Sequence, residues 1–200
     1  MKLLRRIQYN SPVVLSFALV SLAATLAGML TNGYVTQLLF CVYRSAPLNP
    51  LTWLRLFTHT LGHADWNHYA GNMTFFLVLG PMMEEKYGSR PLLGMMAVTA
   101  LLTALVSLLL FPSSALLGAS GLVFMFIVLA SMVHVEQGRV PLTMLLVVAI
   151  YLGQELYTGL VTADNVSQLT HILGGVCGLV FGWKLAPRTG GNHSGNPLAF

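Results

Sequence analysis

The segment LLGASGLVF, residues 116–124, places two glycines, an alanine and a serine inside an otherwise apolar stretch. Small residues of this kind let two helix backbones approach closely inside a membrane. A helix that only had to be buried in lipid would carry leucine here, and not the hydroxyl of Ser120. The segment therefore indicates a close contact between two helices, with a polar group at the point of contact.

The composition is that of an integral membrane protein. Of the 200 residues, 56% are hydrophobic and only 8% are charged, against about 25% charged residues in a typical soluble domain. The mean hydropathy is +0.73. Charges are absent from four long stretches, residues 7–43, 66–83, 91–135 and 165–183. A helix that crosses a bilayer needs about 20 apolar residues, so these stretches accommodate several crossings.

These stretches predict six membrane-spanning helices. The stretch between Arg90 and Glu136 is too long for one crossing, and FPSS at residues 111–114 divides it in two. The expected spans lie at about residues 13–31, 66–83, 92–111, 116–134, 141–160 and 167–185. The fold class that follows is all-α, a polytopic membrane protein with a single six-helix bundle over residues 1–188. A Gly- and Asn-rich tail, residues 189–200, is expected to be disordered.

Lysine and arginine residues predict the orientation of the bundle. With a cytoplasmic N-terminus, eight of the ten fall on the cytoplasmic side: Lys2, Arg5, Arg6, Lys86, Arg90, Arg139, Lys184 and Arg188. Arg44 and Arg55 are left outside, in a long first loop over residues 32–65. Segments rich in these residues stay in the cytoplasm, so we expect both termini there and the protein in a cell (plasma or inner) membrane. The net charge of +4 then reflects topology, and we expect no nucleic-acid partner.

Four polar side chains occur at a similar depth in three of these helices. The helices expected near residues 66, 116 and 167 all run from outside to inside. Each carries polar side chains within about two turns of its outer end, namely His68 with Asn72, Ser120, and His171. His68 and Asn72 are four residues apart and share one helix face. A polar side chain facing lipid is costly, so we expect all four to point into the bundle at one level.

Glycines predict which two helices meet. Gly118 and Gly121 flank Ser120 in the fourth expected helix. The sixth helix carries small residues on the face of its histidine: His171, Gly175, Gly178 and Gly182. Close approach of the two backbones along these residues would bring the Ser120 hydroxyl to the His171 imidazole.

The four polar side chains together predict nucleophilic catalysis. A serine hydroxyl is too weak an acid to attack unaided, and a neutral imidazole beside it serves as its general base. Ser120 and His171 are therefore the expected catalytic pair. His68 and Asn72, with the backbone amide of Ser120, are hydrogen-bond donors suited to stabilise a developing oxyanion.

Simpler explanations exist for each feature taken alone. A cluster such as GASG is common in helix packing, and an interior histidine or asparagine commonly links helices by hydrogen bonds. His59, His63 and His68 also suggest a metal site, but the zinc-protease motif would need a glutamate at position 60, where Thr60 stands. We therefore expect no metal and no cofactor.

Two cysteines and one acid lie outside this pattern. Cys41 and Cys177 have no metal-binding spacing, and we expect no disulfide between them. Glu155 lies near one end of the fifth span and is interpreted as a structural acid. The alternatives are pairing with a polar neighbour, exposure to water near the outer end of the span, and a part in a proton path.

Four segments resemble the rhomboid family of intramembrane serine proteases. They are RLFTHTLGHADWNHYAGNM (55–73), GPMMEEKYGS (80–89), GASG (118–121) and HILGGVCG (171–178), and the similarity extends over about residues 52–183. The resemblance implies a six-helix bundle with a water-accessible cavity and a catalytic core at about residues 52–185. It implies Ser120 as nucleophile, His171 as general base, and an oxyanion hole made by His68, Asn72 and the Ser120 amide.

The resemblance also implies residues with supporting roles. These are Arg55, His59, His63, Glu84, Gly88, Gly118, Gly121, Gly175 and Gly178. Phe124 replaces a frequent tyrosine of the family, and its ring can still stack on His171. Trp53 stands one position earlier than the family's usual Trp-Arg pair.

The activity implied is hydrolysis of a peptide bond in or beside a transmembrane segment, with the active site near the outer face. The expected partners are transmembrane protein substrates and the lipid bilayer. One alternative is a non-catalytic rhomboid-like protein that binds membrane clients; such relatives lack the serine or the histidine. The other is a small transporter or channel, which would carry inverted repeats and helix breaks near the bilayer centre. Neither feature is found in this sequence.

Overall fold

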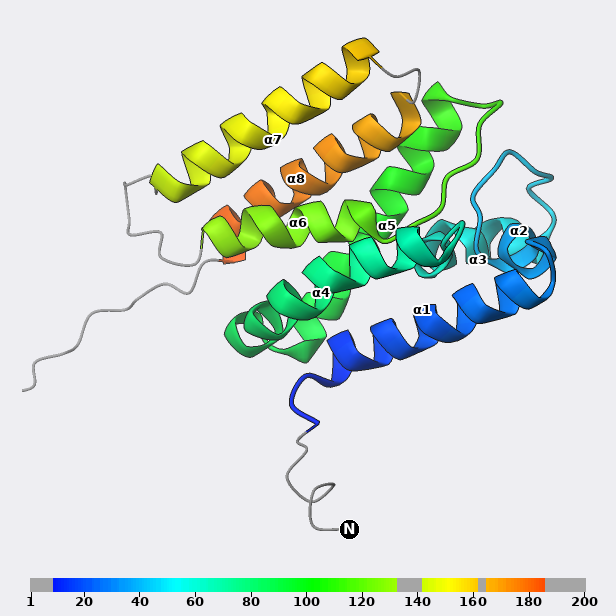
Figure 1. Cartoon of the computed structure of the whole chain (residues 1–200), viewed down its shortest axis with the longest axis horizontal. Helices are drawn as coiled ribbons and strands as arrows, with labels where there is room; N and C mark the ends of the chain where they lie inside the picture. Colours follow the sequence, from blue (N-terminus) through cyan, green and yellow to red (C-terminus); the bar gives the residue numbers. More distant parts are fainter. Residues whose placement is uncertain (1–8, 133–141, 162–164, 186–200) are drawn as a thin grey trace, which may run out of the picture.

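The computed structural model describes residues 9–132, 142–161 and 165–185, and within them the chain is helical (Figure 1). The elements in order are α1 (Pro12–Leu30), α2 (Tyr34–Leu39), α3 (Pro50–Thr58), the 3₁₀ helix η2 (His59–Leu61), α4 (Trp66–Tyr87), α5 (Ser89–Leu110), α6 (Ser120–Ser131), α7 (Leu142–Val161) and α8 (Asn165–Leu185). The predicted tail, residues 189–200, lies outside the described residues.

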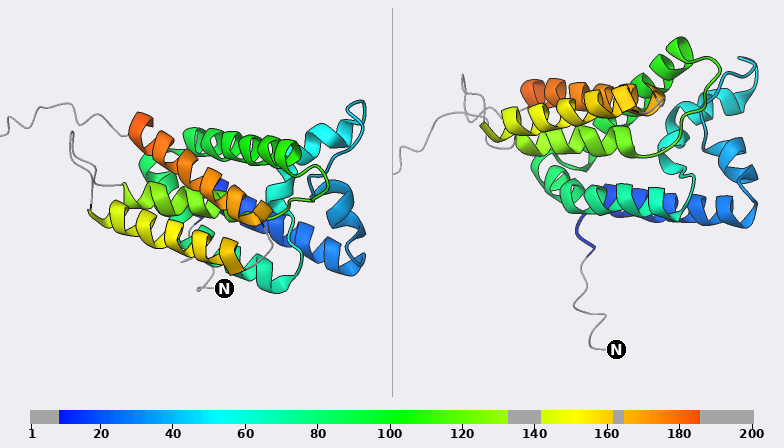
Figure 2. Two further views of the ribbon diagram at one scale, coloured as in Figure 1. Left: turned by 90° about the horizontal axis from the view of Figure 1, so that it is seen from above. Right: turned by 45° about the horizontal axis from the view of Figure 1, so that its top comes forward.

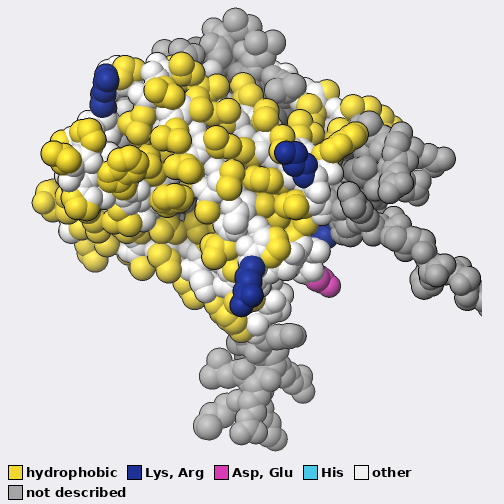
Figure 3. All heavy atoms as spheres, turned by 180° about the vertical axis from the view of Figure 1, so that it is seen from behind, with side chains coloured by type: hydrophobic (Ala, Val, Ile, Leu, Met, Phe, Trp, Pro, Cys, Tyr) yellow, Lys and Arg dark blue, Asp and Glu magenta, His cyan; other side chains and the backbone are white. Residues whose placement is uncertain are grey.

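A helix is present at each of the six predicted spans: α1, α4, α5, α6, α7 and α8. By length and composition, α1, α5 and residues 166–185 of α8 are able to cross a membrane. Hydrophobic side chains cover most of the described face in Figure 3, and few charged side chains interrupt them. An exposed apolar surface of this extent is expected where a protein faces lipid, and the chain is therefore a membrane protein.

Helix α6 lies at the centre of the bundle. It packs against α4, α5, α7 and most extensively against α8, and Figures 1 and 2 show α6, α7 and α8 side by side. Met125, Phe126 and Leu129 of α6 are completely buried. Helix α1 lies along α4, while α2 and α3 gather at the end of the bundle where α1 ends and α4 begins.

The contact between α6 and α8 depends on glycine. A Cβ atom on Gly174 would overlap the carbonyl oxygen of Gly121, and one on Gly178 would lie 2.6 Å from the carbonyl oxygen of Met125. The predicted pairing of these two helices is thus confirmed. Gly182 of the predicted stripe also lies close to Met132 at the end of α6, and Gly174, which the spacing argument passed over, lies directly against α6. Gly175 is buried in the same helix.

Helix α6 begins later than predicted. The expected start was residue 116, but the first helical residue is Ser120. Leu116 instead pairs with Val42 of the first loop through two backbone hydrogen bonds of 2.8 Å. Gly118 then has a φ of +119°, which no helix contains. Tertiary pairing of the backbone therefore takes precedence over the apolar pattern of this segment.

Glu84 joins the first helix to the turn between α4 and α5. Its two carboxylate oxygens accept hydrogen bonds of 3.0 Å from the backbone amides of Val13 and Val14, in the first turn of α1. The Ser89 hydroxyl donates to the same carboxylate at 2.7 Å. The first amides of a helix have no partner inside it, so the buried acid completes their hydrogen bonding and fixes α1 against α4.

Arg55 organises the first loop. Its guanidinium is buried, donates to the carbonyl oxygen of Leu38 at 2.8 Å, and lies over the ring of Tyr43 at 4.4 Å. Helix α3 leaves Trp53, Leu54 and Phe57 exposed on its other side. The loop between α1 and α4 is thus folded around one buried cation.

We predict that Gly174→Ala destabilises the protein by about 2 kcal/mol, because an added methyl group has to displace the α6 backbone. Gly94→Ala in α5 is the matched control, since a Cβ there has nothing within 4 Å. That change is expected to leave stability unchanged or to raise it slightly. Thermal unfolding in detergent compares the two variants, and equal unfolding temperatures would contradict the close backbone contact.

Candidate active site

The four polar residues predicted to meet line one cavity. The cavity has a volume of about 680 Å³, and its walls include His68 and Asn72 of α4, Ser120 of α6 and His171 of α8. It lies where α4, α6 and α8 begin, which is the end of the bundle that α2 and α3 also occupy. Residues separated by up to 103 positions in the chain are thus brought to one opening.

Ser120 is the first residue of α6 and is half-buried. The amide of a first helical residue has no acceptor within its helix, and it lies at the positive end of the helix dipole. Both the hydroxyl and the amide of Ser120 are therefore positioned at the helix terminus that borders the cavity. If α6 began at residue 116, the Ser120 amide would instead donate to the carbonyl oxygen of residue 116 within the helix.

The loop before Ser120 is held by two distant segments. Val42 pairs with Leu116, and the Gly118 amide donates to the carbonyl oxygen of His59 at 2.9 Å. Gly118 is required in this loop for two reasons. Its positive φ disfavours other residues, and a Cβ on it would lie 2.8 Å from Nε2 of His68. The sequence pattern identified Gly118 as a packing residue, but the role of the His59 carbonyl has no signal in the sequence.

Hydrogen bonding indicates the tautomer of His68. The backbone amide of Ala64 donates to Nδ1 of His68 at 3.5 Å, so in the neutral ring the proton is on Nε2. The ring edge formed by Nε2 and Cε1 faces Gly118, two residues before Ser120. Asp65 caps the first turn of α4 by accepting from the His68 amide at 2.8 Å, which holds the backbone of this histidine. His68 therefore presents an N–H group to the backbone beside Ser120.

Asn72 provides a second N–H group without a partner. The residue is only 8% exposed, and its amide nitrogen Nδ2 is among the buried polar atoms that have no hydrogen bond in the described structure. A Cβ on Gly118 would lie 3.8 Å from this nitrogen, so the group also approaches the loop before Ser120. Nearly all buried polar groups in proteins are paired, and an unpaired one calls for an explanation by strain, an unseen water or function.

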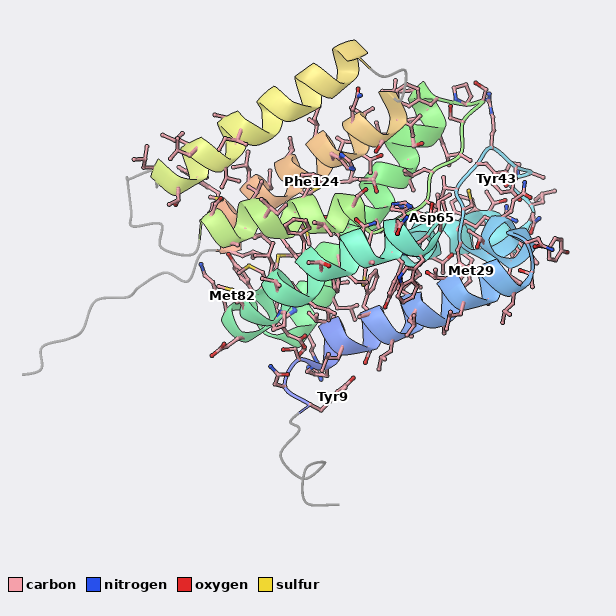
Figure 4. All side chains as sticks on the ribbon, in the orientation of Figure 1. Tyr9, Met29, Tyr43, Asp65, Met82 and Phe124 are labelled. Carbon is pink, nitrogen blue, oxygen red and sulfur yellow. The ribbon has the colours of Figure 1, made fainter. Side chains whose placement is uncertain are left out.

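His171 is half-buried in α8 beside an aromatic ring. The ring centroids of Phe124 and His171 are 4.4 Å apart with an interplanar angle of 41°, which confirms the predicted contact. Phe124 lies between α6 and α8 in Figure 4. Nε2 of His171 is 3.4 Å from the hydroxyl of Ser167, one helical turn earlier. The sequence analysis missed Ser167, although its spacing of four residues from His171 was a signal.

The family of the chain follows from its sequence match. Residues 50–188 match the family model described as Rhomboid domain, which covers more than half of the chain. The chain belongs to the rhomboid family. Among curated proteins, Rhomboid-like protein 11, chloroplastic, of Arabidopsis thaliana is 27% identical over 149 residues, 67% of this chain and 53% of the relative. This rhomboid thus spans about half the length of that relative, whose name refers to the chloroplast.

Other predicted residues of the rhomboid lie away from the cavity. Arg55 is in the first loop, and Glu84 is near the opposite end of α4 from His68. Cys41 and Cys177 are both buried and free. The side chain of Glu155 is outside the described residues, so its role stays a prediction.

The three histidines considered for a metal site have different hydrogen-bond partners. Nδ1 of His59 is 3.1 Å from the carbonyl oxygen of Arg55, and Nδ1 of His63 is 3.2 Å from the hydroxyl of Ser21. Within the described residues, no three His, Cys, Asp or Glu side chains are grouped to hold a metal ion.

We predict that this rhomboid loses thermal stability between pH 7.5 and pH 5. His59 and His63 are 1% and 2% exposed, and burial lowers the pKa of each from 6.5 to about 4. Between these values the unfolded chain binds protons that the folded protein excludes, so the free energy of unfolding decreases as the pH falls.

At pH 5 the free energy of unfolding is expected to be lower by about 2 kcal/mol for each histidine. Thermal unfolding in detergent at the two pH values measures it, and His63→Gln is expected to reduce the difference. An unfolding temperature that does not change with pH would contradict neutral burial of these rings.

Proposed function

We propose that the protein is an intramembrane serine endopeptidase that cleaves peptide bonds in or beside transmembrane segments of other membrane proteins. The observation that carries the proposal is the pair of N–H groups, from His68 and Asn72, directed at the backbone before Ser120 in the cavity that His171 also lines. A buried donor without an acceptor is costly, and a substrate oxyanion would supply the acceptor.

The proposed reaction uses a serine and a histidine. His171 removes the proton from the Ser120 hydroxyl as the hydroxyl attacks the scissile carbonyl carbon, and the carbonyl oxygen becomes an oxyanion. His68, Asn72 and the Ser120 amide donate to that oxyanion. His171 then gives its proton to the leaving amine, and water hydrolyses the acyl-enzyme by the reverse sequence of proton transfers. Phe124 restrains the His171 ring from one side.

The proposal includes six membrane crossings. Helices α4, α6 and α7 are taken to cross with α1, α5 and α8, because α6 is enclosed by α4, α5, α7 and α8. Both termini are then cytoplasmic by the distribution of lysine and arginine, the cavity opens toward the outer face, and the membrane is a cell membrane. The implied substrates are transmembrane segments that unwind locally, with small residues near the cleaved bond.

We predict that Ser120→Ala abolishes cleavage of a membrane-embedded substrate and labelling by a fluorophosphonate, because both require the serine nucleophile. Ser131→Ala is the matched control: it lies in the same helix, and its hydroxyl donates to the Val128 carbonyl of that helix. Cleavage and labelling are measured with purified protein in liposomes. Undiminished activity of Ser120→Ala would exclude the mechanism. Absence of both activities in the unsubstituted protein would favour a non-catalytic client-binding rhomboid.

We predict that Asn72→Ala lowers kcat by about 100-fold to 1,000-fold with little change in KM, since the donor acts on the oxyanion and not on the bound substrate. Thr74→Ala, which removes an exposed hydroxyl bonded to the Ala70 carbonyl in the same helix, is the control and is expected to retain full activity. A KM effect without a kcat effect would place Asn72 in substrate binding instead.

A further inference from the structure

Helix α1 contacts the segment that leads into α4 and the candidate active site, although α1 lies outside the residues that match the family, 50–188. Its Ser21 is completely buried against the segment between η2 and α4. The Ser21 hydroxyl donates to the carbonyl oxygen of Leu61 at 3.0 Å and lies 3.2 Å from Nδ1 of His63. α1 runs beside α4 in Figure 4 and also contacts η2, so Ser21 joins α1 to the segment that leads into α4.

The proton of the Ser21 hydroxyl determines the tautomer of His63. A hydroxyl has one hydrogen, and a carbonyl oxygen can only accept, so the hydrogen is used in the bond to Leu61. The hydroxyl oxygen must then accept from His63, whose Nδ1 carries the ring proton. In agreement, Nε2 of His63 is buried and has no hydrogen-bond partner in the described structure. Ser21 therefore fixes both the position and the proton of this ring.

The His63 ring in turn packs on His68. Their centroids are 4.9 Å apart with an interplanar angle of 76°. Tyr69 holds the His63 ring from another side at 5.5 Å and 88°, and its own hydroxyl donates to the Ala18 carbonyl of α1 at 3.2 Å. Gly118 lies against Nε2 of His68. The His68 ring is thus confined between His63 and the loop before Ser120.

We propose that Ser21 is a positioning residue for His68, which it orients through His63 so that the Nε2–H group points at the site of the oxyanion. This inference rests on the function proposed above. Ser21 and His63 do not line the cavity, so they act on the reaction only through His68. Without the hydroxyl, the Leu61 carbonyl and His63 Nδ1 lose their bonds to Ser21, and the tautomer of the His63 ring and its tilt against His68 are less restrained.

The test compares Ser21→Ala with Thr25→Val in liposomes that contain a cleavable membrane substrate. Thr25 lies one turn further along α1, is about as buried as Ser21, and its hydroxyl donates to the Ser21 carbonyl of its own helix, so Thr25→Val also removes one buried hydroxyl. We expect Ser21→Ala to lower kcat roughly tenfold with KM changed less than twofold, since a donor displaced by a fraction of an ångström weakens only the transition state. Thr25→Val is expected to retain the kcat of the unsubstituted protein. Equal kcat values for the two variants would overturn the inference.

The tautomer of His63 in the unsubstituted protein tests the inference even if Ser21→Ala fails to fold. With ¹⁵N-labelled histidine, His63 is expected to show a protonated Nδ1 and a bare Nε2, and His68 the opposite, with His63→Gln and His68→Gln assigning the signals. A protonated Nε2 on His63 would overturn the inference. Failure of the proposed function has a different signature, because the unsubstituted protein would then neither cleave substrate nor label Ser120.

Discussion

Contact between the backbones of α6 and α8 is the constraint on which the rest of the structure depends. Inside a membrane, apolar side chains gain little by leaving lipid for protein, so helices associate through close packing instead. Gly121 and Gly174 let the two backbones touch. Ser120 and His171 lie one residue and three residues from these glycines. The packing contact therefore also brings the two side chains of the candidate site to the same cavity.

An unpaired polar group at the site lowers the stability of the fold, and helix packing does not explain it. Asn72 keeps a buried N–H group without a partner, and Gly118 keeps a positive φ beside His68. The unpaired Asn72 group weakens the fold slightly, while the glycine at position 118 leaves room for the His68 ring. The surrounding structure compensates with bonds from distant segments, above all Val42 to Leu116 and Gly118 to His59. In the proposed reaction, donors held in this way stabilise the oxyanion.

The sequence analysis was accurate where a local pattern carried the information. Hydropathy located a helix at every predicted span, and helical spacing put His68 and Asn72 on one face. It was less accurate where a distant partner determined the local structure. The start of α6 was misplaced because Leu116 pairs with Val42. Gly174 was missed because spacing from His171 does not reveal which residues of α8 touch the α6 backbone. Ser167 and Ser21 were missed because a serine in an apolar helix has many possible partners.

The sequence by itself determined that the chain is a helical membrane protein of the rhomboid family, and which residues are available for chemistry. Those properties follow from composition, periodicity and motifs that each lie within about one helix. Only the tertiary structure decided which nitrogen of His68 faces the loop before Ser120, why Gly118 must be glycine, and that α1 touches His63 through Ser21. Those properties depend on contacts between segments tens of residues apart, and a hydrogen bond is made by distance and angle, which no local pattern specifies.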